Sequence, residues 1–139
     1  MVSASLVEEA MTDEPVRTGG CQCGAVRYEV RGQPYVSGLC HCTTCRKLTG
    51  SSFSATANWR RDQFSMTGVL ATYEHRQFCP TCGSRLFWLS DEVVEVFLGT
   101  LDQAPYDIRP MLEVWTIRRE HWLPPIPGTI PHDQNPPKA

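Results

Sequence analysis

Short stretches of alternating apolar and polar residues follow one another along most of the chain. The alternation is clearest at residues 26–31 and 53–58. A period of two puts every second side chain on the same face, so each stretch predicts a half-buried β-strand. The two stretches on either side of Gly68 are predicted to form a hairpin. The further predicted strands are residues 35–42, 63–67, 69–73, 85–89, 93–98 and 111–118.

Turn and helix signals separate the predicted strands. Residues 32–34 are predicted to be a turn, and residues 77–83 and 99–110 are predicted to be loops. Residues 43–48 can form one helical turn, which Gly50 would end. Many short strands and the lack of a long helical pattern predict an all-β fold.

The 139 residues are most simply one domain. Residues 1–18 are predicted to be a disordered or loosely packed arm, in which residues 4–11 would form only a marginal helix. Ordered structure is predicted to begin at Gly19, and the folded domain spans residues 19–123. The last residues, 124–139, contain six prolines. Such a tail cannot pair regularly in a sheet, so it is predicted to wrap the surface or to be loose.

Charge and hydropathy exclude several classes of partner. The formal net charge of −2 argues against a nucleic-acid surface, which normally shows a basic stripe. No apolar run approaches the roughly 18 residues that a membrane helix needs. The acidic N-terminal stretch has no basic region followed by an apolar core, so it is not read as a secretory signal. The expected compartment is therefore the reducing cytoplasm, where thiols stay free or bind metal.

Seven cysteines are the main chemical feature of the chain. A disulfide framework fits them badly, because seven is an odd number. The pairs Cys21/Cys23 and Cys40/Cys42 are also too close in sequence to bridge without strain. Metal binding by thiolates is the favoured interpretation.

The run Cys79-Pro-Thr-Cys82-Gly83 is typical of a zinc knuckle, in which the chain curls around one metal ion. A knuckle supplies two ligands and needs a second pair. Cys21 and Cys23 can be that pair, since residues i and i+2 of an extended chain point to the same side. Such a site would staple the N-terminal strand to a distant loop.

The stretch from Cys40 to Cys45 can bring a further three thiolates to one metal ion. Cys40 and Cys42 share a side, and Cys45 returns to it if the two threonines between turn. Three protein ligands and one open position are the pattern of catalytic zinc. Spacing alone leaves the partition open, because an ordinary zinc ribbon is equally consistent with it. That ribbon would join Cys42 and Cys45 with Cys79 and Cys82, and leave Cys21, Cys23 and Cys40.

Four runs of this sequence resemble the family of glutathione-dependent formaldehyde-activating enzymes, the GFA domain, which is shared with relatives of centromere protein V. The runs are Gly20–Tyr28, Cys40–Lys47, Phe78–Ser84 and Gly99–Asp102. The resemblance covers roughly residues 19–122. It implies an all-β, Mss4-like fold of folded antiparallel sheets stapled by zinc. It also implies a structural zinc on Cys21, Cys23, Cys79 and Cys82, and a catalytic-type zinc on Cys40, Cys42 and Cys45.

The activity that this resemblance implies is the condensation of formaldehyde with glutathione to S-(hydroxymethyl)glutathione, whose reverse is a carbon–sulfur lyase reaction. The expected cofactors are two zinc ions per chain, and the expected partner is a small thiol–aldehyde adduct. The sequence departs from the family pattern at Glu113, where a histidine is common, and at Ser51 and Ser52, which follow Gly50 in place of Ala-Pro. The alternative function is a non-catalytic, zinc-stapled binding module. A redox or metal-handling protein with exposed thiolates is the third hypothesis.

Residues near the three-cysteine stretch have weaker predicted roles. Arg46 and Lys47 can hold a carboxylate of an anionic thiol, or can be a solvated face. Gly50 and Ser51 can present backbone donors at the mouth of a pocket. His41 points away from its neighbours' metal in an extended chain, so a packed histidine is favoured over a substrate-side or ligand role.

Overall fold

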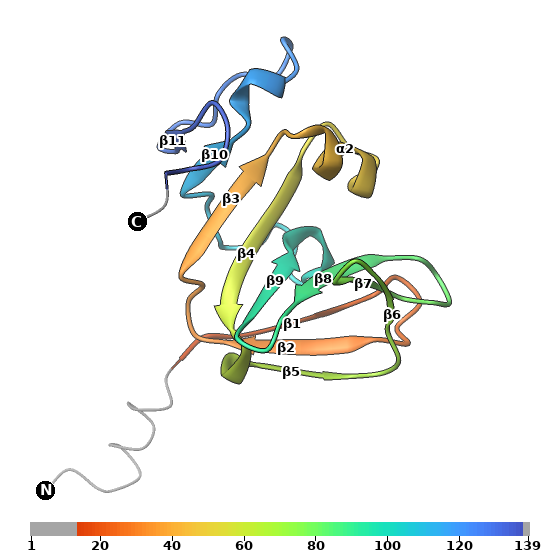
Figure 1. Ribbon diagram of the computed structural model, residues 1–139. Helices are drawn as coiled ribbons and strands as arrows, with labels where there is room; N and C mark the ends of the chain where they lie inside the picture. The colour runs from red at the N-terminus through yellow and green to blue at the C-terminus, as the bar shows by residue number, and fades with distance from the viewer. Residues whose placement is uncertain (1–13, 138–139) are drawn as a thin grey trace, which may run out of the picture.

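The computed structural model of the protein describes residues 14–137, which form two β-sheets and one short α-helix (Figure 1). The all-β prediction is confirmed. The three-stranded sheet is antiparallel throughout and has the order β1–β2–β5. Its strands are β1 (Val16–Gly20), β2 (Arg27–Arg31) and β5 (Phe64–Thr67).

The larger sheet has eight strands in the order β11–β10–β3–β4–β9–β8–β7–β6. Its pairs from β3 to β6 are antiparallel, whereas β10 pairs in parallel with both β3 and β11. The strands are β3 (Val36–Cys40), β4 (Ser54–Arg60), β6 (Ala71–Tyr73), β7 (Arg76–Phe78), β8 (Arg85–Leu89), β9 (Val93–Phe97), β10 (Leu112–Val114) and β11 (Ile130–Pro131).

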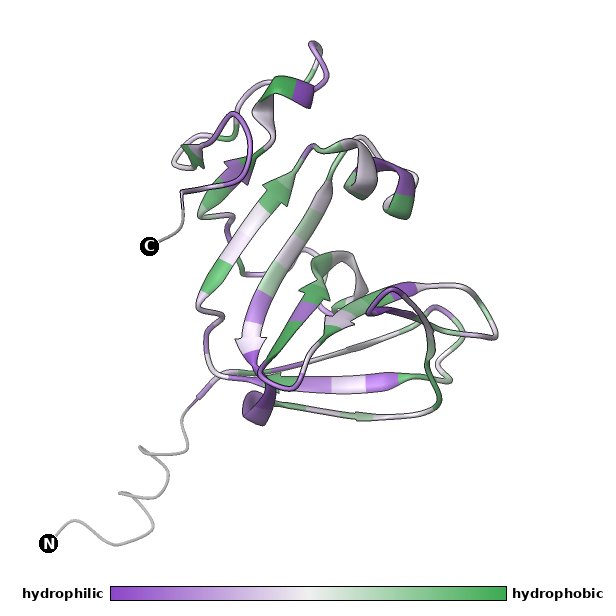
Figure 2. Ribbon diagram, in the orientation of Figure 1, coloured by the Kyte–Doolittle hydropathy of each residue, from purple (hydrophilic) through white to green (hydrophobic). Residues whose placement is uncertain are grey.

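One apolar core joins the two sheets, and the period-two alternation explains why. Along β9, Val94 and Val96 are buried on the core side, and a hydrophilic band interrupts the otherwise apolar strand (Figure 2). The Phe87 ring of β8 packs edge-on against Tyr28 and Phe64 of the small sheet, with ring centroids 4.9 Å apart in both pairs. Burial of such rings is the main stabilising term of a domain of this size.

The helix α2 (Thr43–Thr49) follows β3 and confirms the predicted helical turn. The Cys42 side chain caps its N-terminus by accepting a hydrogen bond from the Cys45 N–H at 3.3 Å. Gly50 ends the helix in the left-handed conformation, at φ 65°, which glycine adopts without steric cost. Three 3₁₀ turns lie at Arg61–Gln63, Leu98–Thr100 and Thr116–Arg118.

The predicted hairpin around Gly68 is wrong, because its two strands lie in different sheets. β5 pairs with β2, and β6 pairs with β7. At Gly68 the chain crosses from one sheet to the other at φ 103°, and a Cβ there would lie 2.3 Å from the Ala25 carbonyl oxygen. Only glycine fits so tight a crossing.

Both ends of the domain take more part in the sheets than predicted. β1 begins at Val16, three residues before the predicted start, and Arg17 is buried against Asp107, with Nε 3.0 Å from Oδ1. The proline-rich tail adds the edge strand β11, against the expectation that it could not pair. The Pro131 nitrogen is not needed for the pairing, since the N–H groups on either side of it donate, from Ile130 to the Met111 carbonyl and from His132 to the Glu113 carbonyl.

The last predicted strand is shorter than expected. β10 stops at Val114, because Trp115 takes a left-handed conformation at φ 57° and starts a 3₁₀ turn. The predicted helix at residues 4–11 lies outside the described residues. Within residues 14–137, no helix has the length and apolar character required to cross a membrane.

Candidate metal centres

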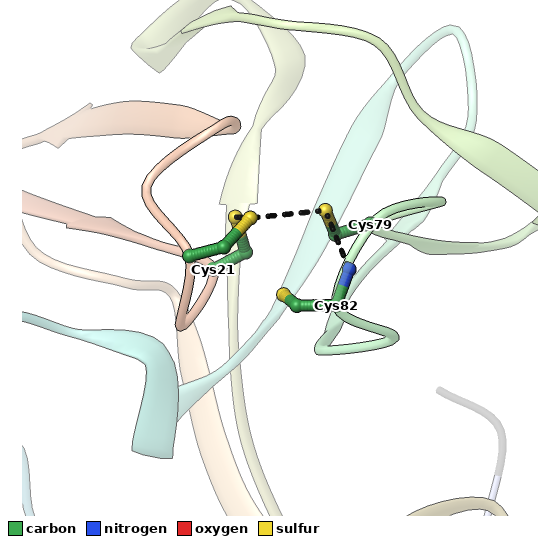
Figure 3. Close-up of side chains that lie close together, drawn as sticks. Cys21, Cys79 and Cys82 are labelled. Carbon is green, nitrogen blue, oxygen red and sulfur yellow. Dashed lines mark hydrogen bonds between the residues drawn. The ribbon is translucent and has the colours of Figure 1, made fainter.

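Four cysteines from two distant parts of the chain meet where the small sheet touches the large one. We call them the four-cysteine cluster: Cys21, Cys23, Cys79 and Cys82. Their sulfur atoms all lie within 4.8 Å of one another. Cys21 follows β1, and Cys79 follows β7 in the loop to β8. Figure 3 shows the labelled cysteines turning toward one another from these two loops.

The spacing of these sulfurs suits a tetrahedral metal ion. The Cys23 Sγ lies 3.6 Å from Cys21 Sγ and 3.7 Å from Cys79 Sγ. Four sulfurs at the usual zinc–sulfur bond length stand about 3.8 Å apart. Backbone N–H groups also point at the sulfurs, from Val26 to Cys21 Sγ at 3.2 Å and from Thr81 to Cys79 Sγ at 3.4 Å. These donors stabilise negative charge on thiolates, so the cluster fits a closed four-thiolate site.

The Ser84 hydroxyl adds a side-chain contact to this cluster. Its Oγ lies 3.2 Å from the Cys82 Sγ. Hydrogen bonds from the Ser84 hydroxyl and backbone lower the pKa of Cys82 to about 5. Cys82 is therefore ready to act as a thiolate ligand.

The other three cysteines form a second, local group, which we call the three-cysteine cluster: Cys40, Cys42 and Cys45. Their sulfurs also lie within 4.8 Å of one another. Cys40 ends β3, Cys42 caps α2, and Cys45 stands in the first turn of that helix. In the described part of the chain, no fourth histidine, cysteine or carboxylate ligand joins them. The seven sulfurs thus group as four and three, and the ribbon pairing does not occur.

The thiols of the three-cysteine cluster share their protons unequally. Hydrogen bonding to the Cys40 thiol, with help from the Ser54 hydroxyl, lowers the pKa of Cys45 to about 5. The same contact, together with burial, raises the pKa of Cys40 well above its ordinary value. In the absence of a metal ion, a Cys45 thiolate therefore accepts a hydrogen bond from a neighbouring thiol. A divalent cation that binds all three sulfurs would displace the remaining thiol protons.

A pocket of about 270 Å³ opens beside this second cluster. It is lined by Cys40, Cys45, Thr56, Asn58, Glu95 and Pro136, with apolar side chains of β3 and β10 completing the wall. Thr56 and Asn58 on β4 lie opposite Phe97 and Glu95 of β9 in the sheet register, which puts them on the same face.

Glu95 is a pocket residue that the sequence reasoning missed. Burial, with a smaller contribution from the Cys45 thiolate, raises the pKa of its carboxyl above the ordinary value. The signal available in the sequence was a lone charge within the apolar run from Val93 to Leu98.

Comparison with known proteins gives the family of the chain. The family model described as "Glutathione-dependent formaldehyde-activating enzyme" matches residues 16–118. The chain belongs to this family, GFA. A Halomonas elongata protein, itself only provisionally assigned as a glutathione-dependent formaldehyde-activating enzyme, is 30% identical in an alignment of 117 positions that covers 68% of this chain and 74% of the relative. A crystal structure of a Rhodobacter sphaeroides protein is 25% identical, with a TM-score of 0.44 over 67% of this chain and 91% of that one.

His41 of this GFA chain lies away from the pocket. Its side chain is fully buried, and its Nε2 is 3.0 Å from Glu113 Oε1. The ring packs at a tilt against Phe53, with centroids 5.8 Å apart. The described residues offer no hydrogen-bond partner for its Nδ1. His41 therefore takes the packed position that the extended chain favours.

Glu113 is the acceptor at the centre of a buried network. Besides His41, its carboxylate accepts hydrogen bonds from Arg119 Nη2 at 3.1 Å, Ile126 N at 3.2 Å and Thr129 Oγ1 at 3.1 Å. Burial alone would raise the pKa of Glu113, but these donors, His41 first, outweigh it and leave the pKa lowered. The network ties the C-terminal segment to the strand beside the three-cysteine cluster.

The predicted substrate-binding residues share a different surface. Arg46, Lys47, Gly50 and Ser51 line an open depression on α2 that contains none of the cysteines. Arg46 donates to the Arg118 carbonyl oxygen at 3.0 Å and pairs with the Glu120 carboxylate. Arg46 thus fastens α2 to the 3₁₀ turn at 116–118, and a substrate role for these residues stays a prediction.

Proposed function

We propose that the three-cysteine cluster holds a zinc ion at which a small thiol adds to formaldehyde, and at which the adduct is split in the reverse, carbon–sulfur lyase direction. The observation that carries this proposal is a cluster of three thiols that opens on a pocket and has no fourth protein ligand within residues 14–137. An open coordination position is what distinguishes catalytic from structural zinc. Membership of the GFA family supports the choice of formaldehyde.

Zinc fits both donor sets, because soft thiolate ligands select a d¹⁰ ion such as zinc(II) or copper(I) over magnesium or calcium. When bound, zinc lowers the pKa of an incoming thiol and holds it as the thiolate. We assign the four-cysteine cluster the structural ion, since its ligands surround the position and come from two distant segments.

The reaction conserves all its atoms and needs no oxidant. The thiolate sulfur forms a bond to the carbonyl carbon of formaldehyde, and the carbonyl π pair moves to the oxygen. The proton that the thiol released returns to this oxygen and completes the hydroxymethyl thioether. Cys40 and Cys45 would hold the ion that positions the sulfur, and the Thr56 hydroxyl and Asn58 amide line the same pocket as donors to the developing alkoxide.

Glutathione is the thiol that the family name supplies for this reaction. A cytoplasmic location suits the proposal, because seven reduced thiols persist in a reducing compartment.

The test is formaldehyde exchange with thiols, followed by NMR on the zinc-loaded protein. We expect faster adduct formation and faster adduct breakdown than in buffer. Cys45→Ser is expected to lose the acceleration and to remain folded. No acceleration with glutathione, 2-mercaptoethanol or any other small thiol would support the alternative, a zinc-stapled binding module that turns nothing over.

A further inference from the structure

The pocket beside the three-cysteine cluster holds a single charged side chain outside the thiols, Glu95. No lysine, arginine or histidine lines it. Within residues 14–137, no hydrogen-bond donor and no cationic side chain pairs with the Glu95 carboxylate. A half-buried, unpaired carboxylate makes the potential inside such a pocket negative.

Two arginines near the pocket pair with other groups of the protein. Arg76, whose charge is felt by the Cys45 thiolate, holds Glu74 at 2.9 Å. Arg46 is bound to Glu120 and the Arg118 carbonyl on the far side of α2. Three thiolates on one divalent ion leave a net charge of about −1, which adds to the charge of Glu95. A ligand carboxylate in this pocket would meet two sources of repulsion and no cationic side chain in the lining.

We propose that the thiol this pocket accepts is small and carries a neutral or cationic head group, so that carboxylate-bearing thiols such as glutathione are poor substrates. The inference rests on the proposed thiol addition and deepens it by naming the class of thiol. Glu95, with Asn58 and Thr56 beside it, is the specificity-determining group, since it accepts hydrogen bonds from hydroxyl or ammonium donors and repels carboxylates.

The size of the pocket agrees with a small thiol. Sites for drug-sized ligands usually exceed about 300 Å³, whereas this one has about 270 Å³. A sphere of that volume is roughly 8 Å across, so the head group of a small thiol bound inside it lies within about 8 Å of Glu95. At an effective dielectric constant of about 20, one unit charge at that distance changes an equilibrium constant by about tenfold or more.

The experiment compares three thiols with the same two-carbon tether: thiocholine, which is cationic, 2-mercaptoethanol, which is neutral, and 3-mercaptopropionate, which is anionic. Two readouts are taken on the zinc-loaded protein: kcat/KM with formaldehyde, and the dissociation constant of each thiol by calorimetry without formaldehyde. We expect thiocholine and 2-mercaptoethanol to exceed 3-mercaptopropionate by about tenfold or more in both.

Glu95→Gln keeps the shape of the side chain and removes its charge. We expect this variant to lose most of the discrimination against 3-mercaptopropionate. Glu92→Gln is the matched control, because Glu92 is exposed in the turn before β9, and we expect it to keep the discrimination of the native protein.

A second cavity is an alternative binding site for the carboxylate of an anionic thiol. It has about 440 Å³, shares Ser54 with the surroundings of Cys45, and is lined by Arg85, whose Nε and Nη2 have no partner among the described residues. If 3-mercaptopropionate or glutathione is preferred to thiocholine, and Arg85→Met removes that preference, the carboxylate binds there and the inference is overturned. A preference for thiocholine that Glu95→Gln leaves unchanged also overturns it. Lack of binding and of acceleration with all three thiols would instead reject the proposed reaction itself.

Discussion

The two cysteine clusters use the same ligand atom in opposite ways. The four-cysteine cluster joins the turn after β1 to the loop after β7, and N–H groups and the Ser84 hydroxyl surround its sulfurs. The three-cysteine cluster lies within one β3–α2 connection and opens on a pocket. Ligands far apart in sequence close a long loop and stabilise the fold, whereas ligands close in sequence close almost none. This difference is the reason why we propose a structural ion for the first cluster and a reactive ion for the second.

The largest effect is expected from removing a ligand of the four-cysteine cluster. Cys82→Ser should cost on the order of 10 kcal/mol of metal-coupled folding free energy, which exceeds the stability of an ordinary domain. We expect the variant to unfold or aggregate, as measured by circular dichroism and zinc content. A soluble Cys82→Ser protein with native circular dichroism would contradict the structural role of this cluster.

The next largest effect is expected at Glu113, beside the other cluster. Glu113→Gln leaves buried donors of His41 and Arg119 without a charged acceptor, and should lower the free energy of unfolding by about 3 kcal/mol at neutral pH. Chemical denaturation of the zinc-loaded protein measures it. Zinc content should stay at two ions, since Glu113 is no ligand in the proposed sites.

The pH dependence of that difference follows from the lowered pKa of Glu113. A carboxyl whose folded pKa lies below its unfolded value stabilises the fold fully above the unfolded pKa, about 4.3, and loses this contribution as the pH falls through the folded value. We therefore expect the native protein and Glu113→Gln to converge in stability in acid. Because both proteins contain the same cysteines, the effect of cysteine protonation on stability cancels when one curve of unfolding free energy against pH is subtracted from the other. A constant difference down to the acid transition would contradict the ionised state of Glu113.

A smaller effect on stability is expected from Cys45→Ser. The variant should stay folded, bind about one zinc ion fewer, and change the free energy of unfolding by about 1 kcal/mol. Metal analysis and thermal melting give both values. Equal behaviour of Cys45→Ser and Cys82→Ser would remove the distinction between the two clusters.

The smallest effect is expected from Arg46→Gln. The ion pair with Glu120 is about one third exposed on both sides, so solvent screening limits its contribution to at most about 1 kcal/mol. We also expect the kinetic constants for neutral thiols to stay unchanged, because the Arg46 side chain lies outside the cysteine pocket. A large rise in KM would return Arg46 to the substrate role that its position in the sequence suggests.

Local features of the sequence predicted most of the strands and all of the metal candidates. The period-two alternation locates β2 and β4, and the apolar runs at 85–89 and 93–98 locate β8 and β9. The spacing of Cys40, Cys42 and Cys45 predicts their convergence. All three signals depend on a few neighbouring residues. Pairing between distant segments has no such local signal. The separation of β5 from β6, the addition of β11, and the grouping of Cys21 with Cys79 all depend on which segments meet in three dimensions.

The same limit explains what was missed at the candidate site. His41 and Glu113 meet because β3 and β10 pair in parallel, with Glu113 opposite Leu39. Glu95 faces the three-cysteine pocket because β9 pairs with β4, with Glu95 opposite Asn58. A lone glutamate within an apolar strand was visible in the sequence, but its neighbour was not.

The most direct test of the difference between the clusters is a thiol titration of the protein loaded with cobalt(II) in place of zinc. Thiolate-to-cobalt charge-transfer absorption reports each sulfur ligand, and the added probe is 2-mercaptoethanol. We expect the absorption to rise as one of the two cobalt ions gains a thiolate, and Cys45→Ser to abolish the rise. No change in the spectrum of the fully loaded protein would contradict it, because both ions would then have no open coordination position.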